Sequence, residues 1–173
     1  MVKTRSKTRV ICDAGPLIHL DEVDSLYLMQ DFSEVIISER VQQEVLRHRS
    51  ISFADPNIDW RILPEILPLD PSLQTMCKMF SLDSGEVSAL SILSRSPDAV
   101  FLTDDAAARL VATKSGYRVH GTIGILVRAI RRDMMKPEQV IDVLQSLSLK
   151  STLYIGSSIL DEVIDSIKAE HEL

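Results

Sequence analysis

The sequence predicts an α/β fold: a three-layer α/β/α sandwich around a central, mainly parallel sheet of four to five strands. Short apolar, β-branched runs alternate along the chain with stretches of helical periodicity, the pattern of a parallel sheet covered by helices on both faces. The 173 residues include 45% hydrophobic and 25% charged residues, the composition of one globular domain with a sizeable core. We therefore expect a single domain over residues 1–173, without internal repeats or linkers.

The first expected strand covers residues 10–12 and ends at Asp13. Gly15 and Pro16 then turn the chain into a helix with proline in its first turn, and residues 17–20 and 25–32 carry apolar side chains at helical spacing. Asp13 would lie at the carboxyl end of a parallel strand, where ligands and catalytic groups collect. Taken alone, it also suits a helix cap or a turn.

The middle of the chain continues the alternation of strands and helices. Residues 34–38 predict a β-branched strand, and Ser38 is placed to cap a helix over residues 39–48. Four prolines between residues 51 and 71 exclude one long helix, so we expect a loop with a short strand at 60–63. Two capped helices should follow, one opened by Asp70 and running to about residue 80, and one opened by a capping box from Asp83 to Glu86 and running to about residue 94.

The last third repeats the pattern and then adds an extension. The expected strands cover residues 99–102 and 117–119, and the expected helices cover 106–115, 123–132, 137–147 and 158–168. We expect residues 1–8 to form a flexible basic tail and residues 150–173 a C-terminal strand and helix extension. The broad apolar face of the terminal helix suits packing on its own domain, or alternatively docking of a dimer mate or of a peptide from a partner protein.

Several acidic residues fall where a pure core would place apolar ones. Asp104 and Asp105 directly follow a buried strand, and Glu44 flanks an apolar stripe of its helix. Glu86 shares the sheet-facing side of its helix with apolar residues three and four positions on. Each acid has a plain alternative, since Glu44 suits a solvated edge and the others suit helix caps or first-turn acids.

Together these acids predict a metal site. A parallel sheet would bring Asp13, Glu44, Glu86, Asp104 and Asp105 toward the same edge. Carboxylates gathered in one pocket raise one another's pKa values unless a cation neutralises them. Oxygen ligands without nearby His or Cys suit one or two Mg²⁺ or Mn²⁺ ions, which activate water and stabilise the leaving oxygen in phosphodiester hydrolysis.

Four pieces of the chain, in order, resemble the PIN-domain nucleases, particularly the toxin-like branch of prokaryotic toxin–antitoxin systems. The pieces are VICDAGPLIHL from Val10, VIISERVQQEVL from Val35, LDSGEVSAL from Leu82 and FLTDDAAARLVATKSGYRVHGTIGIL from Phe101. The resemblance spans about residues 8–147. It implies a Rossmann-like sandwich and metal-dependent, often RNA-directed, nuclease activity.

Carried over residue by residue, the resemblance implies catalytic and metal-binding roles for Asp13, Glu44, Glu86 and Asp105. Asp105 matches the aspartate of the Thr-x-Asp motif that ends the fourth strand, and Asp104 is an adjacent acid counted with the metal ligands. Glu86 stands where many relatives have an aspartate, and this departure leaves the geometry of its site open. The expected activity is that of a metal-dependent endoribonuclease, the toxin of a toxin–antitoxin pair.

Substrate contacts are expected from Thr103, Arg40, Arg47 and Arg109, because basic residues near the acidic mouth would hold a polyanion. Arg49, directly after the helix that carries Arg40 and Arg47, is a further candidate. For each arginine taken alone, ordinary surface charge is the simpler explanation. The net charge of −6 argues against a protein that coats nucleic acid but not against one with a local site.

The expected partners are RNA, an antitoxin protein and a second copy of the chain. No apolar run approaches the roughly 18 residues of a membrane span, the basic N-terminus leads into no signal-like segment, and the two cysteines lie in unrelated contexts. These features favour a reduced, cytoplasmic setting.

Two other functions fit parts of the sequence. A PIN-like binding or regulatory module with weak or no catalysis would suit the glutamate at position 86 and the acidic net charge. A phosphotransfer enzyme with Asp13 as nucleophile is disfavoured, because residue 15 is a glycine rather than the second aspartate of haloacid-dehalogenase-like phosphatases.

Overall fold

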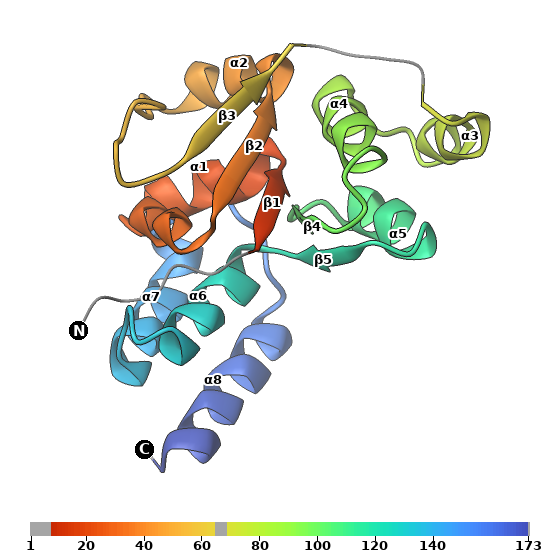
Figure 1. Ribbon diagram of the computed structural model, residues 1–173. Helices are drawn as coiled ribbons and strands as arrows, with labels where there is room; N and C mark the ends of the chain where they lie inside the picture. The colour runs from red at the N-terminus through yellow and green to blue at the C-terminus, as the bar shows by residue number, and fades with distance from the viewer. Residues whose placement is uncertain (1–7, 65–68, 173) are drawn as a thin grey trace.

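Five parallel strands form one central sheet in the order β3-β2-β1-β4-β5 (Figure 1). The computed structural model describes residues 8–64 and 69–172. The strands are β1 (Arg9–Cys12), β2 (Glu34–Ser38), β3 (Trp60–Leu63), β4 (Val100–Leu102) and β5 (Arg118–His120). The predicted α/β/α sandwich with a parallel sheet is confirmed.

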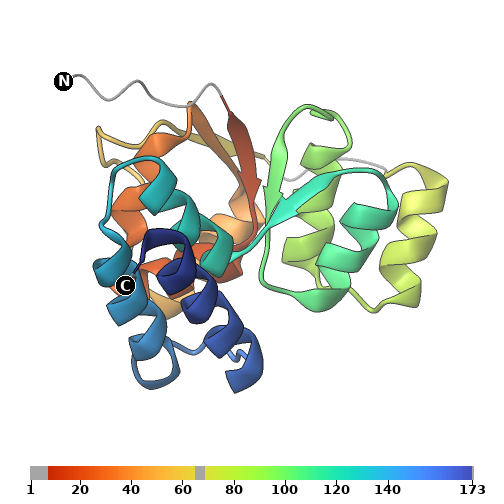
Figure 2. The same cartoon turned by 90° about the horizontal axis from the view of Figure 1, so that it is seen from below.

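Helices cover both faces of this sheet (Figure 2). Helices α1 and α6 pack together on one face, and α4 and α5 lie on the other, with α3 outside against α5. Helix α7 packs on α6, and α8 packs on α7. The bounds are α1 (Ala14–Glu22), the 3₁₀ helix η1 (Leu26–Asp31), α2 (Glu39–His48), α3 (Pro71–Met79), α4 (Ser84–Leu93), α5 (Ala106–Lys114), α6 (Thr122–Arg131), α7 (Pro137–Lys150) and α8 (Ser157–His171).

The core lies between the sheet and its two helical layers. The central strands β1 and β4 are apolar on both faces, and Ile11 and Phe101 are completely buried, because helices cover both sides of a parallel sheet. Crossovers between parallel strands place all the strand ends that precede helices at one edge of the sheet. Asp13 and the Asp104–Asp105 pair follow β1 and β4 at this edge.

Two expected elements take a different form. Residues 26–31 form a 3₁₀ helix rather than an α-helix. The expected strand in the C-terminal extension is wrong, since β5 is the last strand of the described chain. Residues 151–152 instead bond to the carboxylate of Glu22 at the end of α1, so this segment crosses between α7 and α8 without joining the sheet.

The C-terminal helix packs on its own domain through α7, the first of the two uses expected for it. Most of the expected basic tail, residues 1–7, lies outside the described residues, as do residues 65–68 of the proline-rich loop. Across the described ranges, no helix combines the length and apolar character that a bilayer crossing requires.

Candidate active site

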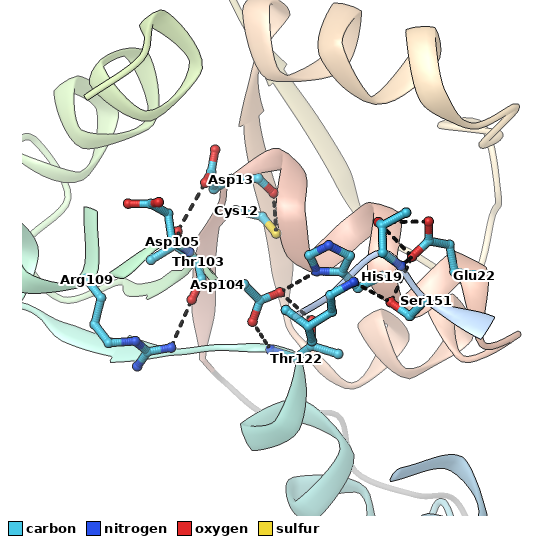
Figure 3. Close-up of polar contacts among 12 residues, drawn as sticks. Cys12, Asp13, His19, Glu22, Thr103, Asp104, Asp105, Arg109, Thr122 and Ser151 are labelled. Atoms are coloured by element: carbon cyan, nitrogen blue, oxygen red, sulfur yellow. Dashed lines mark hydrogen bonds and ion pairs between the residues drawn. The ribbon is translucent and has the colours of Figure 1, made fainter. Parts of the chain in front are cut away.

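Strand register places Asp13 beside Thr103. Cys12 pairs with Leu102 across β1 and β4, so the residues that follow them are neighbours at the sheet edge. The Thr103 hydroxyl donates to Asp13 Oδ2 at 3.1 Å and accepts from the backbone N–H of Asp105 at 3.2 Å (Figure 3). Thr103 is completely buried. Its hydroxyl positions Asp13, and its contact with substrate stays a prediction.

An open pocket of about 330 Å³ lies at this edge and collects acids from four segments of the chain. Asp13 follows β1, Glu44 projects from α2, and Glu86 belongs to the first turn of α4. The four acids predicted to be catalytic all line this pocket. Its carboxylates are those of Asp13, Glu44, Asp83, Glu86, Asp104 and Asp105.

These carboxylates lie close enough to affect one another's charge. The pKa of Asp13 is raised to about 7, chiefly by burial and to a smaller extent by the charges of Glu44 and Asp83, against the hydrogen bonds from Ala14 and Thr103 that lower it. Burial likewise raises the pKa of Glu86 to about 7, with added repulsion from Asp83, Asp105 and Asp13. Burial and then Asp83 raise the pKa of Glu44. At neutral pH, the carboxyl groups of the pocket therefore cannot all lose their protons as freely as they would in water.

Helix caps use one oxygen of several of these carboxylates. Asp83 and Glu86 form a capping box, in which Glu86 Oε2 accepts the Asp83 N–H at 2.8 Å and Asp83 Oδ1 accepts the Glu86 N–H at 2.9 Å. Asp105 Oδ1 accepts the Ala108 N–H at 2.7 Å and caps α5. Each of these caps engages a single carboxylate oxygen, so a capping role and a ligand role are compatible in the same residue.

Gly85 makes room for the carboxylate of Glu44. A Cβ atom at position 85 would lie 2.6 Å from Glu44 Oε2, far inside contact distance. The absence of a side chain thus lets α2 and α4 bring Glu44 next to the acids at the start of α4.

Asp104 lines the acidic pocket but has hydrogen-bond partners outside the cluster of acids. Its Oδ1 accepts the Thr122 N–H at 2.7 Å, and its Oδ2 accepts the Thr122 hydroxyl at 2.6 Å and contacts His19 Nδ1 at 2.8 Å (Figure 3). Burial opposes its charge, but the bonds from His19 and Thr122 outweigh burial and lower its pKa. Asp104 therefore ties β4 to α1 and to the start of α6, and its metal-binding role stays a prediction.

An acid and a histidine of the pocket, Asp83 and His19, were not among the predicted site residues. Asp83 was predicted only as a helix cap, although a capping box places both of its acids at one helix start. His19 lies one helical turn after Gly15, and a Cβ at position 15 would be in ordinary contact, at 3.6 Å, with the His19 ring and with Asp104. Neither signal distinguishes a site from ordinary packing without the tertiary fold.

The predicted substrate-binding arginines lie outside this pocket. The Arg109 guanidinium donates to the Thr103 carbonyl at 2.9 Å and faces a neighbouring hollow. Arg47 is exposed on α2 and lies near enough to Glu44 to lower its pKa, after the larger effects of burial and Asp83 and beside that of His48. Arg40 lies at the start of α2, and Arg49, the residue directly after α2, pairs with Asp21.

The donor set fits a hard divalent cation, because it consists of carboxylate oxygens whose mutual repulsion burial intensifies. His19 is the basic side chain among the described residues of the pocket, and it pairs with Asp104. Over the described ranges, no three His, Cys, Asp or Glu side chains stand ready to hold a metal ion.

Comparison with known proteins identifies the family. A family model described as a PIN domain matches residues 9–169, which include all five strands and the acidic pocket. No curated protein and no solved structure matches the chain. Proteins with this domain are generally nucleases and generally use divalent metal ions. The chain belongs to the PIN-domain family.

Proposed function

We propose that this PIN-domain protein is a metal-dependent endoribonuclease that hydrolyses RNA phosphodiester bonds at the acidic pocket. The observation that supports the proposal most strongly is the convergence of Asp13, Glu44, Glu86 and Asp105 from separate elements on one open pocket. Burial makes this concentration of negative charge costly, and a protein that evolved only for stability would gain from neutral residues there. A bound cation removes that cost.

The chain's own residues would hold Mg²⁺ or Mn²⁺ through the carboxylates of Asp13, Glu44, Glu86 and Asp105, with Asp83 beside them. A divalent ion bound there supplies activation of a water molecule and stabilisation of the leaving oxygen. Thr103 holds the Asp13 carboxylate in place, and the capping box holds Glu86 and Asp83 at the rim of the pocket. These contacts orient the oxygen ligands before substrate arrives.

We also propose the role of toxin in a toxin–antitoxin pair. The ordered motifs from Val10 to Leu126 support this role, since they resemble the toxin-like branch of the family. The partners would then be RNA, an antitoxin protein and a second copy of this chain.

A second function is a PIN-like binding module without useful catalysis. The observation that favours it is the lack of three ligand side chains arranged for a metal ion within the described residues. The longer side chain of Glu86 also departs from the aspartate expected there. The two functions differ in whether millimolar Mn²⁺ binds, which calorimetry measures directly.

Cleavage of RNA by an Asp13→Asn variant tests the proposed function. The wild-type chain should cleave single-stranded RNA with Mn²⁺ or Mg²⁺ and lose activity in EDTA. Asp13→Asn should lower the cleavage rate by roughly 100-fold or more, because it removes a buried charged ligand. Asp142→Asn, an exposed aspartate on α7, is the matched control and should cleave normally. Equal cleavage by the wild-type and Asp13→Asn chains would contradict the assignment.

A further inference from the structure

A second hollow adjoins the acidic pocket. It has a volume of about 440 Å³ and lies between β5, the start of α6, the segment 153–156 and α8. Leu153 and Tyr154 line both cavities, so the crossing segment forms the rim that separates them. A chain-like ligand that leaves the acidic pocket across this rim enters the second hollow directly.

Positive groups distinguish the second hollow from the first, although the carboxylate of Asp104 lines both. Arg109 and the exposed His120 line it, and Arg128 and Arg131 lie near His120 along α6. Burial, and then the positive charges of Arg109, Arg128 and Arg131, lower the pKa of His120. Arg128 is already paired with Asp31, which leaves Arg109 and Arg131 as the main positive groups of this surface.

Tyr154 stands at the rim with its ring in solvent. Its exposed fraction is 94%, so packing does not account for its placement. The segment that carries it is nonetheless held in place. Glu22 Oε2 accepts the Ser151 hydroxyl and the Thr152 N–H, each at 2.8 Å. An aromatic ring on an anchored segment is a preformed surface for stacking.

We propose that this second hollow binds the nucleotides that flank the reacting phosphodiester of a single-stranded nucleic acid, with Arg109 and His120 facing phosphates inside the hollow, Arg131 facing a phosphate beyond its edge near His120, and Tyr154 stacking on a base. The inference rests on the proposed nuclease function. Single strands offer unpaired bases to an aromatic ring, whereas a duplex hides them. The volume of the hollow suits a ligand of nucleotide size.

The experiment measures binding rather than cleavage. Full-length chains carrying Asp13→Asn are titrated with a fluorescein-labelled ten-nucleotide RNA in Mg²⁺, and affinity is followed by fluorescence anisotropy. Adding Tyr154→Ala should weaken binding about five-fold or more through loss of stacking. Tyr27→Ala removes another exposed tyrosine, on η1, and should leave affinity unchanged.

The salt dependence of binding tests the charged part of the proposal. Adding Arg131→Gln should reduce the slope of log affinity against log salt by about 0.7, the value for one phosphate contact on a single strand. Arg95→Gln removes an exposed arginine from the opposite edge of the sheet, before β4, and should leave the slope unchanged. A matched DNA strand shows whether the hollow requires the RNA 2′-hydroxyl.

Two results together would overturn the proposal: equal RNA affinity of the Tyr154→Ala and Tyr27→Ala chains, and equal salt slopes of the Arg131→Gln and Arg95→Gln chains. The hollow would then be a binding site for a protein segment instead. The outcome is separate from the test of catalysis. If Asp13→Asn does not affect cleavage but Tyr154→Ala weakens binding, the metal-site assignment fails and the binding surface stands. If Asp13→Asn abolishes cleavage but Tyr154 and Arg131 do not affect binding, only the binding surface fails.

Discussion

Asp13 occupies a position where a negative charge is costly. Its side chain is buried and accepts one hydrogen bond from a side chain, that of Thr103, while Glu44 and Asp83 repel it. Burial therefore raises its pKa to about 7 in the folded protein, whereas an aspartate in an unfolded chain has a pKa of about 3.9. The folded state consequently binds the Asp13 proton more tightly than the unfolded state does.

This difference predicts how stability changes with pH in the metal-free protein. The contribution of protonated Asp13 is complete below the unfolded pKa of about 3.9 and is lost as pH rises through the folded pKa of about 7. Asp13→Asn removes the charge and should raise the melting temperature in EDTA at pH 8 by at least about 2 °C. The gain should shrink toward pH 4.

Thermal melts of Asp13→Asn and wild-type protein at pH 4 and pH 8 check this expectation, with Asp142→Asn as control. A lower melting temperature for Asp13→Asn at pH 8, or the same difference at both pH values, would show that Asp13 is not a destabilised carboxylate. Adding Mn²⁺ at pH 8 should stabilise the wild-type chain and leave Asp13→Asn nearly unaffected, because a ligand stabilises only a state that binds it.

At the scale of elements, α2 and α4 determine whether Glu44 reaches the pocket. The Ser38 hydroxyl accepts the Val41 N–H at 3.1 Å and fixes the start of α2, and the capping box fixes the start of α4. Both caps agree with the local sequence. The close approach of these helices at Gly85 depends on packing between residues about 40 positions apart, which no local signal describes.

A Gly85→Ala substitution should separate stability from metal binding. The added methyl group would displace the Glu44 carboxylate, which is the flexible end of a side chain. Alanine also favours a helix over glycine by roughly 0.5–1 kcal/mol. We expect an unchanged or higher melting temperature with Mn²⁺ affinity about ten-fold weaker by calorimetry.

The control for Gly85→Ala is Gly156→Ala, because a Cβ at position 156 meets its nearest neighbour at 4.0 Å. That variant should bind Mn²⁺ like the wild-type chain. Undiminished Mn²⁺ affinity in Gly85→Ala would show that Glu44 is not a ligand.

At the scale of the whole molecule, one carboxylate joins the first helix to the C-terminal extension. Glu22 at the end of α1 accepts hydrogen bonds from Ser151 and Thr152, about 130 positions away. Burial opposes its charge, but these bonds outweigh burial and lower the pKa of Glu22. The segment after α7 is thereby held over the pocket edge instead of adding a strand to the sheet.

Glu22→Ala should release this segment without unfolding the domain. The Thr152 amide loses its acceptor, so its hydrogen exchange should speed up about ten-fold, in line with one lost charge-assisted bond. Amides of β1 and β4 should exchange as in the wild-type chain. Asp142→Ala on α7 is the control, and unchanged exchange at Thr152 in Glu22→Ala would show that this tie does not hold the segment.

The order of strands and helices could be predicted from the sequence because its signals are local. Each of these signals acts over a few residues. They are the apolar runs of the strands, the helix caps at Ser38, Asp70 and Asp83, and the turn at Gly116, whose φ is +85°. The acids at the ends of β1 and β4 follow from the same reasoning, since parallel strands bring their carboxyl ends to one edge.

Only the tertiary structure decided what each side chain at that edge does. Adjacent in sequence, Asp104 and Asp105 point to different partners, because Asp104 meets His19 and Thr122 while Asp105 caps α5 beside the pocket. Thr103 faces Asp13 because of strand register, and the extension crosses the site because Glu22 holds it. Local sequence patterns are enough to predict the α/β architecture and the sheet edge where the acids gather. Which acids share the pocket depends on long-range packing, because it brings together residues that no local pattern connects.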